Sequence, residues 1–168
     1  MNAEVRDIGA FSEPLLIFGG PYSYLAATQA LRAEAERLGI PAQRVVCTGD
    51  LIAYCAHPQE TADFIREWGI SVVRGNCEEF LANGAADCGC GFAAGTVCST
   101  LSVEWYNYAA QRISDATRHW FASLPAALQL SFHGHRFPGC PRHPDPDQQV
   151  RLRLNRPGRK NPRTGSAQ

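Results

Sequence analysis

Residues 44–78 read RVVCTGDLIAYCAHPQETADFIREWGISVVRGNCE, and this stretch decides the fold. Its two short apolar runs, 44–47 and 70–73, predict buried strands. Between them, Pro58 fits the first turn of a helix with one apolar face, and Gly69 is its stop signal. A strand, a helix and a second strand in this order predict two parallel strands joined by a right-handed crossover.

The same pattern continues toward the N-terminus. Residues 15–18, LLIF, predict another strand, which we expect to be buried on both faces. Ser23 is placed to cap a following helix, which stops at Gly39. The order β-α-β-α-β therefore predicts an α/β fold, a parallel sheet with flanking helices.

The pattern weakens toward the C-terminus. Residues 79–100, rich in Gly, Ala and Cys, read as loop or short helix, 101–123 as helical, and 128–132 as one more strand. We expect a domain over 14–135, followed by a disordered Pro/Arg-rich tail over 138–168. A shifted reading frame in a GC-rich gene would give such an end, and a nucleic-acid-binding arm is the alternative.

Composition bounds the class of protein. The 168 residues are 45% hydrophobic and 19% charged, with 16 basic and 16 acidic residues, which excludes a disordered, collagen-like or coiled-coil chain. No apolar run approaches the roughly 20 residues of a membrane span, so we expect no membrane partner. The N-terminus has no basic n-region, and we interpret the seven cysteines as reduced thiols of a cytoplasmic protein.

Polar residues and glycines follow each predicted strand. In a parallel sheet, ligands bind at the carboxyl ends of the strands, which here read GGPYS, TGD and RGNCE. Asp50 and Asn76 offer oxygen atoms suited to a hard divalent cation. The alternative is a purely structural role, in which both side chains only form hydrogen bonds within turns. The glycines that would let a ligand approach the backbone are Gly19, Gly20, Gly49 and Gly75.

Residues 15 to about 81 resemble the calcineurin-like metallophosphoesterases, in particular small bacterial phosphodiesterases of the diadenosine-tetraphosphatase-like branch. The family motifs G-D-x-H-G-N-L, G-D and R-G-N-H-D/E correspond to residues 19–25, 49–50 and 74–78. The resemblance implies the N-terminal half of a metallophosphoesterase-type α/β sandwich. It also implies that Asp50 bridges two metals and that Asn76 binds the second metal and phosphate.

This chain departs from the family motifs at the ligand positions. The first-motif Asp and His are replaced by Gly20 and Tyr22, and the catalytic His of the third motif is Cys77. The later histidine ligands are not matched, since His133 and His135 come too early and read as surface residues. The resemblance therefore implies a degenerate site, weak activity and a chain truncated at its C-terminus.

The cysteines leave alternatives open. One alternative makes Cys77 a substitute metal ligand, with Cys88 and Cys90 as further thiolates beside Asp50, since thiolate suits a softer ion such as zinc. A disulfide or redox role and inert thiols are the other options. A small buried hydrophobic side chain is the simplest interpretation of Cys47, and it also suits Cys55 and Cys98. The expected cofactor is a divalent metal, Mn, Zn or Fe.

Three functions remain open from the sequence. The first is metal-dependent hydrolysis of a small phosphomonoester or phosphodiester, with Asp50, Asn76 and Cys77 as catalytic residues. The second is a non-catalytic relative that binds a nucleotide or a protein. The third is a truncated, non-functional product. The sequence does not favour a nucleic-acid partner and leaves the substrate and the oligomeric state open.

Overall fold

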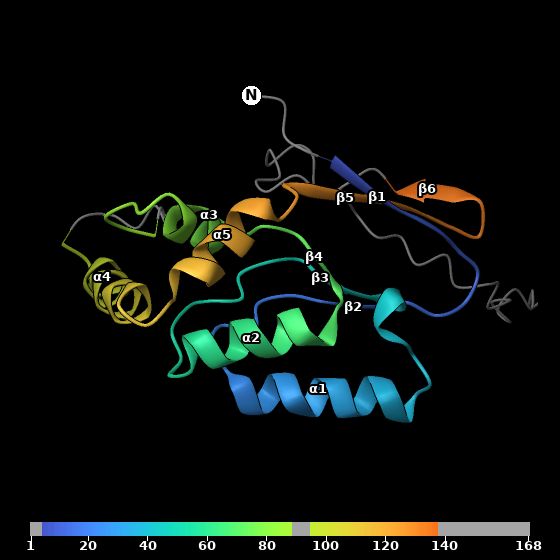
Figure 1. Ribbon diagram of the computed structural model, residues 1–168, viewed down its shortest axis with the longest axis horizontal. Coiled ribbons are helices and arrows are strands. Elements are labelled where there is room, and N and C mark those ends of the chain that lie inside the picture. The colour runs from blue at the N-terminus through green and yellow to red at the C-terminus, as the bar shows by residue number, and fades with distance from the viewer. Residues whose placement is uncertain (1–4, 89–94, 138–168) are drawn as a thin grey trace, which may run out of the picture.

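The computed structural model describes residues 5–88 and 95–137, which form two small β-sheets and five α-helices (Figure 1). The predicted tail, 138–168, lies outside the described residues. Among the described helices, none has the length and apolarity needed to cross a bilayer. In chain order the elements are β1 (Val5–Phe11), β2 (Leu16–Phe18), α1 (Leu25–Arg37), a 3-10 turn (Ala42–Arg44), β3 (Val45–Cys47), α2 (Pro58–Trp68), β4 (Ser71–Val72), α3 (Asn76–Ala82), α4 (Val97–Ala110), α5 (Asp115–Ser123), β5 (Ala127–Phe132) and β6 (His135–Phe137).

The three strands predicted around residues 44–78 and 15–18 form a parallel sheet of order β2-β3-β4. Leu16 of β2 lies opposite Val45 of β3, and β3 pairs in parallel with β4. α1 and α2 lie together on one side of these strands (Figure 1), where Ala35, Val45 and Trp68 form a buried cluster. Gly69 ends α2 with φ +72°, as its position in the sequence predicts.

The burial expected for β2 is wrong on one face. Ile17 is 51% exposed, although the sequence predicts a strand buried on both faces. β2 is the edge strand of its sheet, and α1 and α2 cover only one side of it. A short apolar run alone does not reveal whether the second face is covered.

A second sheet, of order β1-β5-β6, was only partly predicted. β5 occupies the alternating segment near residue 130, and β1 pairs with it in parallel, starting with Val5 opposite Ala127. The sequence analysis places no strand before residue 15, because β1 is mostly exposed and lacks the alternation of a half-buried strand. β6 returns antiparallel to β5, and both His133 and His135 are exposed, as expected.

The helices differ in detail from the sequence-based expectation. Residues 101–123 are largely helical, as predicted, but they belong to two helices, α4 and α5, and Ser114 caps α5 by accepting a hydrogen bond from Thr117 N at 3.2 Å. α3 is a short helix, one of the two alternatives expected for residues 79–100, but it begins earlier than expected, at Asn76. Ser23 is not a helix cap: its Oγ accepts a hydrogen bond from Ala53 N at 3.2 Å, and Tyr24 precedes α1.

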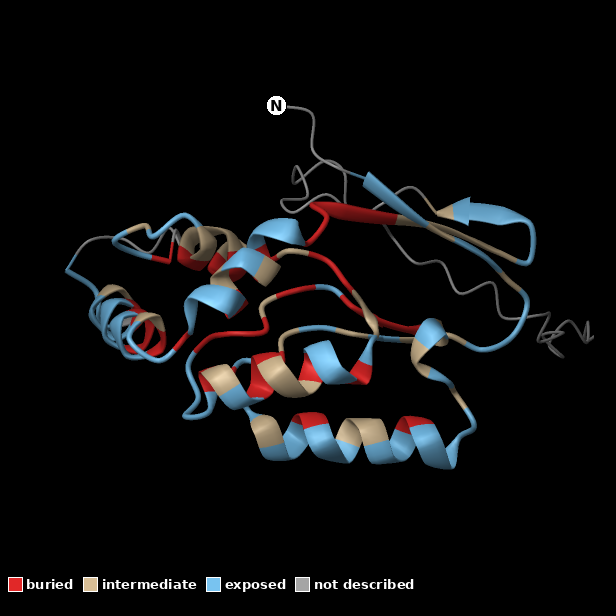
Figure 2. Cartoon of the chain, viewed as in Figure 1, coloured by how far each residue is buried: buried red, intermediate tan, exposed pale blue. Residues whose placement is uncertain are grey.

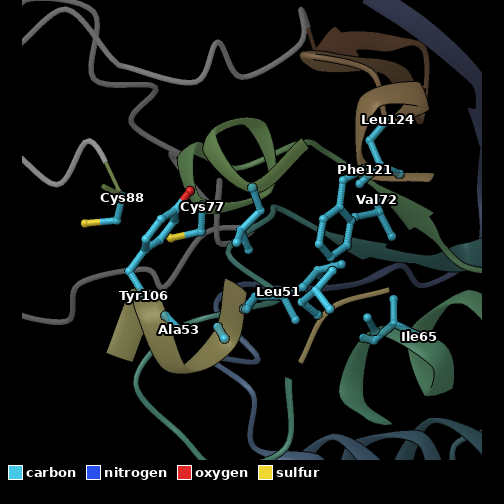
Figure 3. Packing of buried hydrophobic residues seen from close by; sticks show 14 of the residues in the cluster. Leu51, Ala53, Ile65, Val72, Cys77, Cys88, Tyr106, Phe121 and Leu124 are labelled. Atoms are coloured by element: carbon cyan, nitrogen blue, oxygen red, sulfur yellow. The ribbon is translucent and has the colours of Figure 1, made fainter. Parts of the chain in front are cut away.

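The largest buried cluster lies beside the carboxyl ends of the parallel strands. Leu51 and Ile52, in the loop after β3, are fully buried, and they pack with Leu81 of α3, Tyr106 of α4 and Phe121 of α5 (Figures 2 and 3). A buried loop needs partners for its backbone groups. This loop is therefore fixed in place next to Asp50, the residue before Leu51.

Candidate functional site at the carboxyl ends of the parallel strands

Backbone hydrogen bonds join the segments that follow β2 and β3. Gly20 N donates to Gly49 O at 3.2 Å, and Tyr22 N donates to Asp50 O at 3.2 Å. Gly49 has φ +102°, and a Cβ there would lie 2.7 Å from Gly75 N, so only glycine fits between β3 and β4. The structure thus brings the predicted glycines at positions 20, 49 and 75 together around Asp50. Gly19 lies one residue earlier, against Thr48.

The Glu78 side chain connects the loop after β3 to the start of α3. The sequence analysis did not identify Glu78 as a site residue. Its side chain is fully buried, and its Oε2 accepts hydrogen bonds from Asp50 N and Gly75 N, both at 2.9 Å. Its Oε1 accepts a third from Ile52 N at 3.2 Å. Burial, followed by the nearby Asp50 charge, raises the pKa of Glu78 to about 7, although the three N–H donors oppose this. A Glu three residues after the glycine before a helix is a capping signal that reveals part of this role.

Asp50 presents the least satisfied polar atom of the site. It has φ +56°, a left-handed conformation that Asp tolerates better than most residues. Its Oδ1 is buried with no hydrogen-bond partner, and it lies so close to Gly75 that a side chain there would collide with it. Burial raises the pKa of Asp50. A buried carboxylate oxygen without a partner favours either protonation or a bound cation.

Tyr22 fills the space beside Gly20. The ring of Tyr22 overlaps the volume that a Gly20 side chain would take, and its hydroxyl lies 2.6 Å from that Cβ position. Burial raises the pKa of Tyr22, and the charge of Asp50 raises it further, so the phenol stays protonated. The position where the resembling family carries an Asp ligand is thus occupied by a neutral phenol.

Asn76 and Cys77 start α3 but face different surroundings. Asn76 Nδ2 donates to Cys88 O at 2.9 Å. Cys77 is 4% exposed within the main core cluster, near Tyr106 (Figure 3), and burial raises the pKa of its thiol. Cys77 is therefore a protonated core thiol in this structure.

The remaining cysteines divide between packing, surface and cross-link. Cys47 is fully buried, as expected, whereas Cys55 is exposed, which corrects the expectation of a buried side chain. Cys88 is disulfide-bonded, which departs from the expectation of reduced thiols and leaves no thiolate there for a metal. Cys90 and the side chain of Cys98 lie outside the described residues.

A two-metal centre does not fit these residues. In residues 5–88 and 95–137, no group of three or more His, Cys, Asp or Glu side chains is placed to hold a metal. Glu78 already accepts three backbone hydrogen bonds, and Gly20 has no donor atom. The unpartnered Oδ1 of Asp50 does fit one hard cation, because such a cation prefers carboxylate oxygen.

A row of aromatic rings borders the site. The ring centroids of Tyr22 and Tyr54 are 5.3 Å apart, and those of Tyr54 and Trp105 are also 5.3 Å apart. Tyr54 is 58% exposed, so part of this row faces solvent. Exposed aromatic rings of this kind are suited to stacking against a planar ligand.

Comparison with known proteins identifies the fold. No family model and no curated protein matches this chain. A crystal structure described as a "putative diadenosine tetraphosphatase" superposes with a TM-score of 0.53 at 17% identity, covering 76% of this chain and 50% of that one. A metallophosphoesterase from Sphaerobacter thermophilus gives a TM-score of 0.49 at 17% identity, over 70% of this chain and 43% of the other. The chain thus shares the fold of the first of these structures and spans about half of that structure's length.

Proposed function

We propose that this chain, with its metallophosphoesterase fold, binds a small phosphoester through one divalent cation at Asp50 and hydrolyses it slowly. The buried Oδ1 of Asp50, which has no hydrogen-bond partner, carries the proposal. A cation there would neutralise the carboxylate and attract the phosphoester anion. Such a cation, Mn, Zn or Fe, would supply Lewis-acid chemistry to the phosphoryl group when bound.

The surrounding residues support binding better than fast turnover. Asn76, at the start of α3 beside Gly75, would orient the phosphoryl group without adding charge. Cys77 would be a weak proton donor to the leaving group, because its thiol is buried and its pKa is raised. Without general-acid help, the rate falls by about 10²–10⁴, so we expect turnover only of esters with good leaving groups.

Two measurements on the purified chain test this proposal. Metal analysis after incubation with Mn²⁺ or Zn²⁺ should find about one ion per chain. Hydrolysis of an aryl phosphodiester should be slow and should vanish in Asp50→Asn. Turnover that survives Asp50→Asn, or two tightly bound ions per chain, would contradict the proposal.

The exposed aromatic row favours a second candidate, nucleotide binding without hydrolysis. A nucleobase could stack on Tyr54 while its phosphates lie near Asp50, since Tyr22 contacts both the row and the site. A nucleoside diphosphate that binds with Mn²⁺ and remains intact would favour this candidate over the first. Loss of that binding in Tyr54→Ala, with the aryl ester still hydrolysed, would separate base stacking from phosphoester binding.

A cytoplasmic location is also a proposal. It is supported by the free thiols of Cys47, Cys55 and Cys77, whereas the disulfide at Cys88 argues against it. Thiol counting on protein prepared from its native cells with a rapid acid quench would decide the point.

A further inference from the structure

A cavity of about 160 Å³ lies beside β4, away from the candidate site. Its floor is apolar and is formed by α2, β4 and β5 through Ile65, Val72 and Leu128, which are all buried. A cavity of about 150 Å³ holds one benzene ring when its walls are apolar. This cavity therefore has the size for a single aromatic ring, and its lining combines the apolar floor with polar groups.

The lining of this cavity also contains two cations and an indole. Arg66 of α2 lies over the ring of Trp120 of α5, with its guanidinium carbon 5.9 Å from the ring centroid. Arg6 of β1 donates to Ser123 O at 3.4 Å. One guanidinium group thus comes from β1 and the other from α2, and both contact α5 at the cavity.

Within residues 5–88 and 95–137, no carboxylate neutralises either arginine. None of these described residues that line the cavity is an Asp or Glu, and neither Arg6 nor Arg66 forms an ion pair with any of them. Three other arginines, Arg32, Arg37 and Arg44, do pair with glutamates. Two guanidinium groups without counter-charges beside an apolar floor therefore call for an anionic ligand with an apolar body.

We propose that this cavity binds a small aromatic anion, its ring against Trp120 and the apolar floor and its carboxylate or phosphate between Arg6 and Arg66. Both head groups present planar pairs of oxygens that match a guanidinium fork. The cavity shares no residue with the candidate site around Asp50, so this proposal stands apart from the proposed function.

Benzoate and phenyl phosphate are the test ligands, and benzyl alcohol is the neutral comparison. Binding is followed by calorimetry and by the indole N–H signal of Trp120, which is assigned with Trp120→Phe. We expect saturable binding of at least one anion, a shift of the Trp120 signal, and at least about tenfold weaker binding in Arg6→Gln and in Arg66→Gln. The preferred head group identifies the ligand as a carboxylate or a phosphate.

Arg32→Gln is the matched control, because Arg32 also lies over an aromatic ring, Phe64, but is paired with Glu36. With EDTA present, so that no cation occupies the Asp50 site, this variant and Asp50→Asn should both bind the anion as the unchanged chain does. The proposal is overturned if the Trp120 signal does not shift or if benzyl alcohol binds as tightly. It is equally overturned if Arg32→Gln weakens binding as much as Arg66→Gln, or if Asp50→Asn abolishes it.

Discussion

At the scale of single residues, the site is defined by one carboxylate that lacks a partner. Asp50 was found from the sequence because an Asp after a buried strand and a glycine is a recognisable pattern. The role of Tyr22 was not foreseen, because a ring that folds back over Gly20 leaves no signal in residue spacing. The sequence therefore predicted that these strand ends lie together, but it did not predict that the Tyr22 ring fills the space beside Gly20.

Asp50→Asn should stabilise the metal-free protein. Burial raises the pKa of Asp50, so the ionised form costs folding free energy above the pKa of the unfolded chain. Removing the charge should raise the unfolding free energy by about 1 kcal/mol in denaturant with EDTA. Asp115→Asn, which removes an exposed charge from the first turn of α5, should instead lower it slightly. A loss of stability in Asp50→Asn under EDTA would contradict the unpartnered state of Oδ1.

Gly20 and Tyr22 should couple strongly when substituted. Gly20→Ala places a methyl group in the volume of the Tyr22 ring. The backbone at this position also has φ +56°, which strains any residue other than glycine. We therefore expect the free energy of unfolding to fall by about 1–3 kcal/mol. In a Tyr22→Ala background the collision is gone, and Gly20→Ala should cost only the backbone strain. A double-mutant cycle by chemical denaturation measures the difference. Additive effects would show that the ring does not occupy this space.

The thiols should differ in reactivity according to burial. Burial raises the pKa of Cys47 to about 12, and it also raises the pKa of Cys77, whereas Cys55 is exposed. Because the thiolate is the reactive form, iodoacetamide at neutral pH should modify Cys55 first and leave Cys47 and Cys77 until the chain unfolds. Peptide mass spectrometry with and without denaturant measures the order of modification. Early labelling of Cys77 would instead show that its thiol is accessible to solvent.

At the scale of elements, the β-α-β-α-β order was predictable because each strand is bounded by glycine or proline and each helix carries an apolar face. The start of α3 at Asn76 was not, because a glycine followed by polar residues after a strand looks like a turn. The helix starts there because the Glu78 carboxylate reaches back to Gly75 N and to the loop after β3. That contact joins segments almost thirty residues apart, which no local pattern reports.

Glu78→Gln should therefore loosen β3, β4 and α3 together. The amide has one acceptor oxygen in place of two, so at least one of the three backbone N–H donors loses its partner in a buried setting. We expect a loss of about 1–3 kcal/mol in unfolding free energy. Glu60→Gln, in the exposed first turn of α2, should cost far less. Equal effects of the two variants would show that the three bonds are not important for stability.

At the scale of the whole molecule, β1 extends the folded body beyond the domain that the sequence suggested. β1 pairs with β5 although their residues are more than a hundred positions apart, and Arg6 reaches Ser123 as well. The domain proposed over 14–135 thus packs against a strand that lies before its first residue. A fragment that starts at residue 14 would expose an edge of β5 and should be less soluble than one that starts at residue 5.

Limited trypsin digestion tests the proposed division between body and tail. From 136 onward the sequence has eight basic residues, many beside proline or polar residues, and its composition cannot bury a core. In the body, Arg74 and Arg118 donate to the carbonyls of Ala122, Leu81 and Ala110, which should protect their backbone from cleavage. We expect early cuts after 136 and a lasting fragment that keeps β1 and ends near residue 136. Cleavage after Arg74 or Arg118 as early as in the tail would overturn this division.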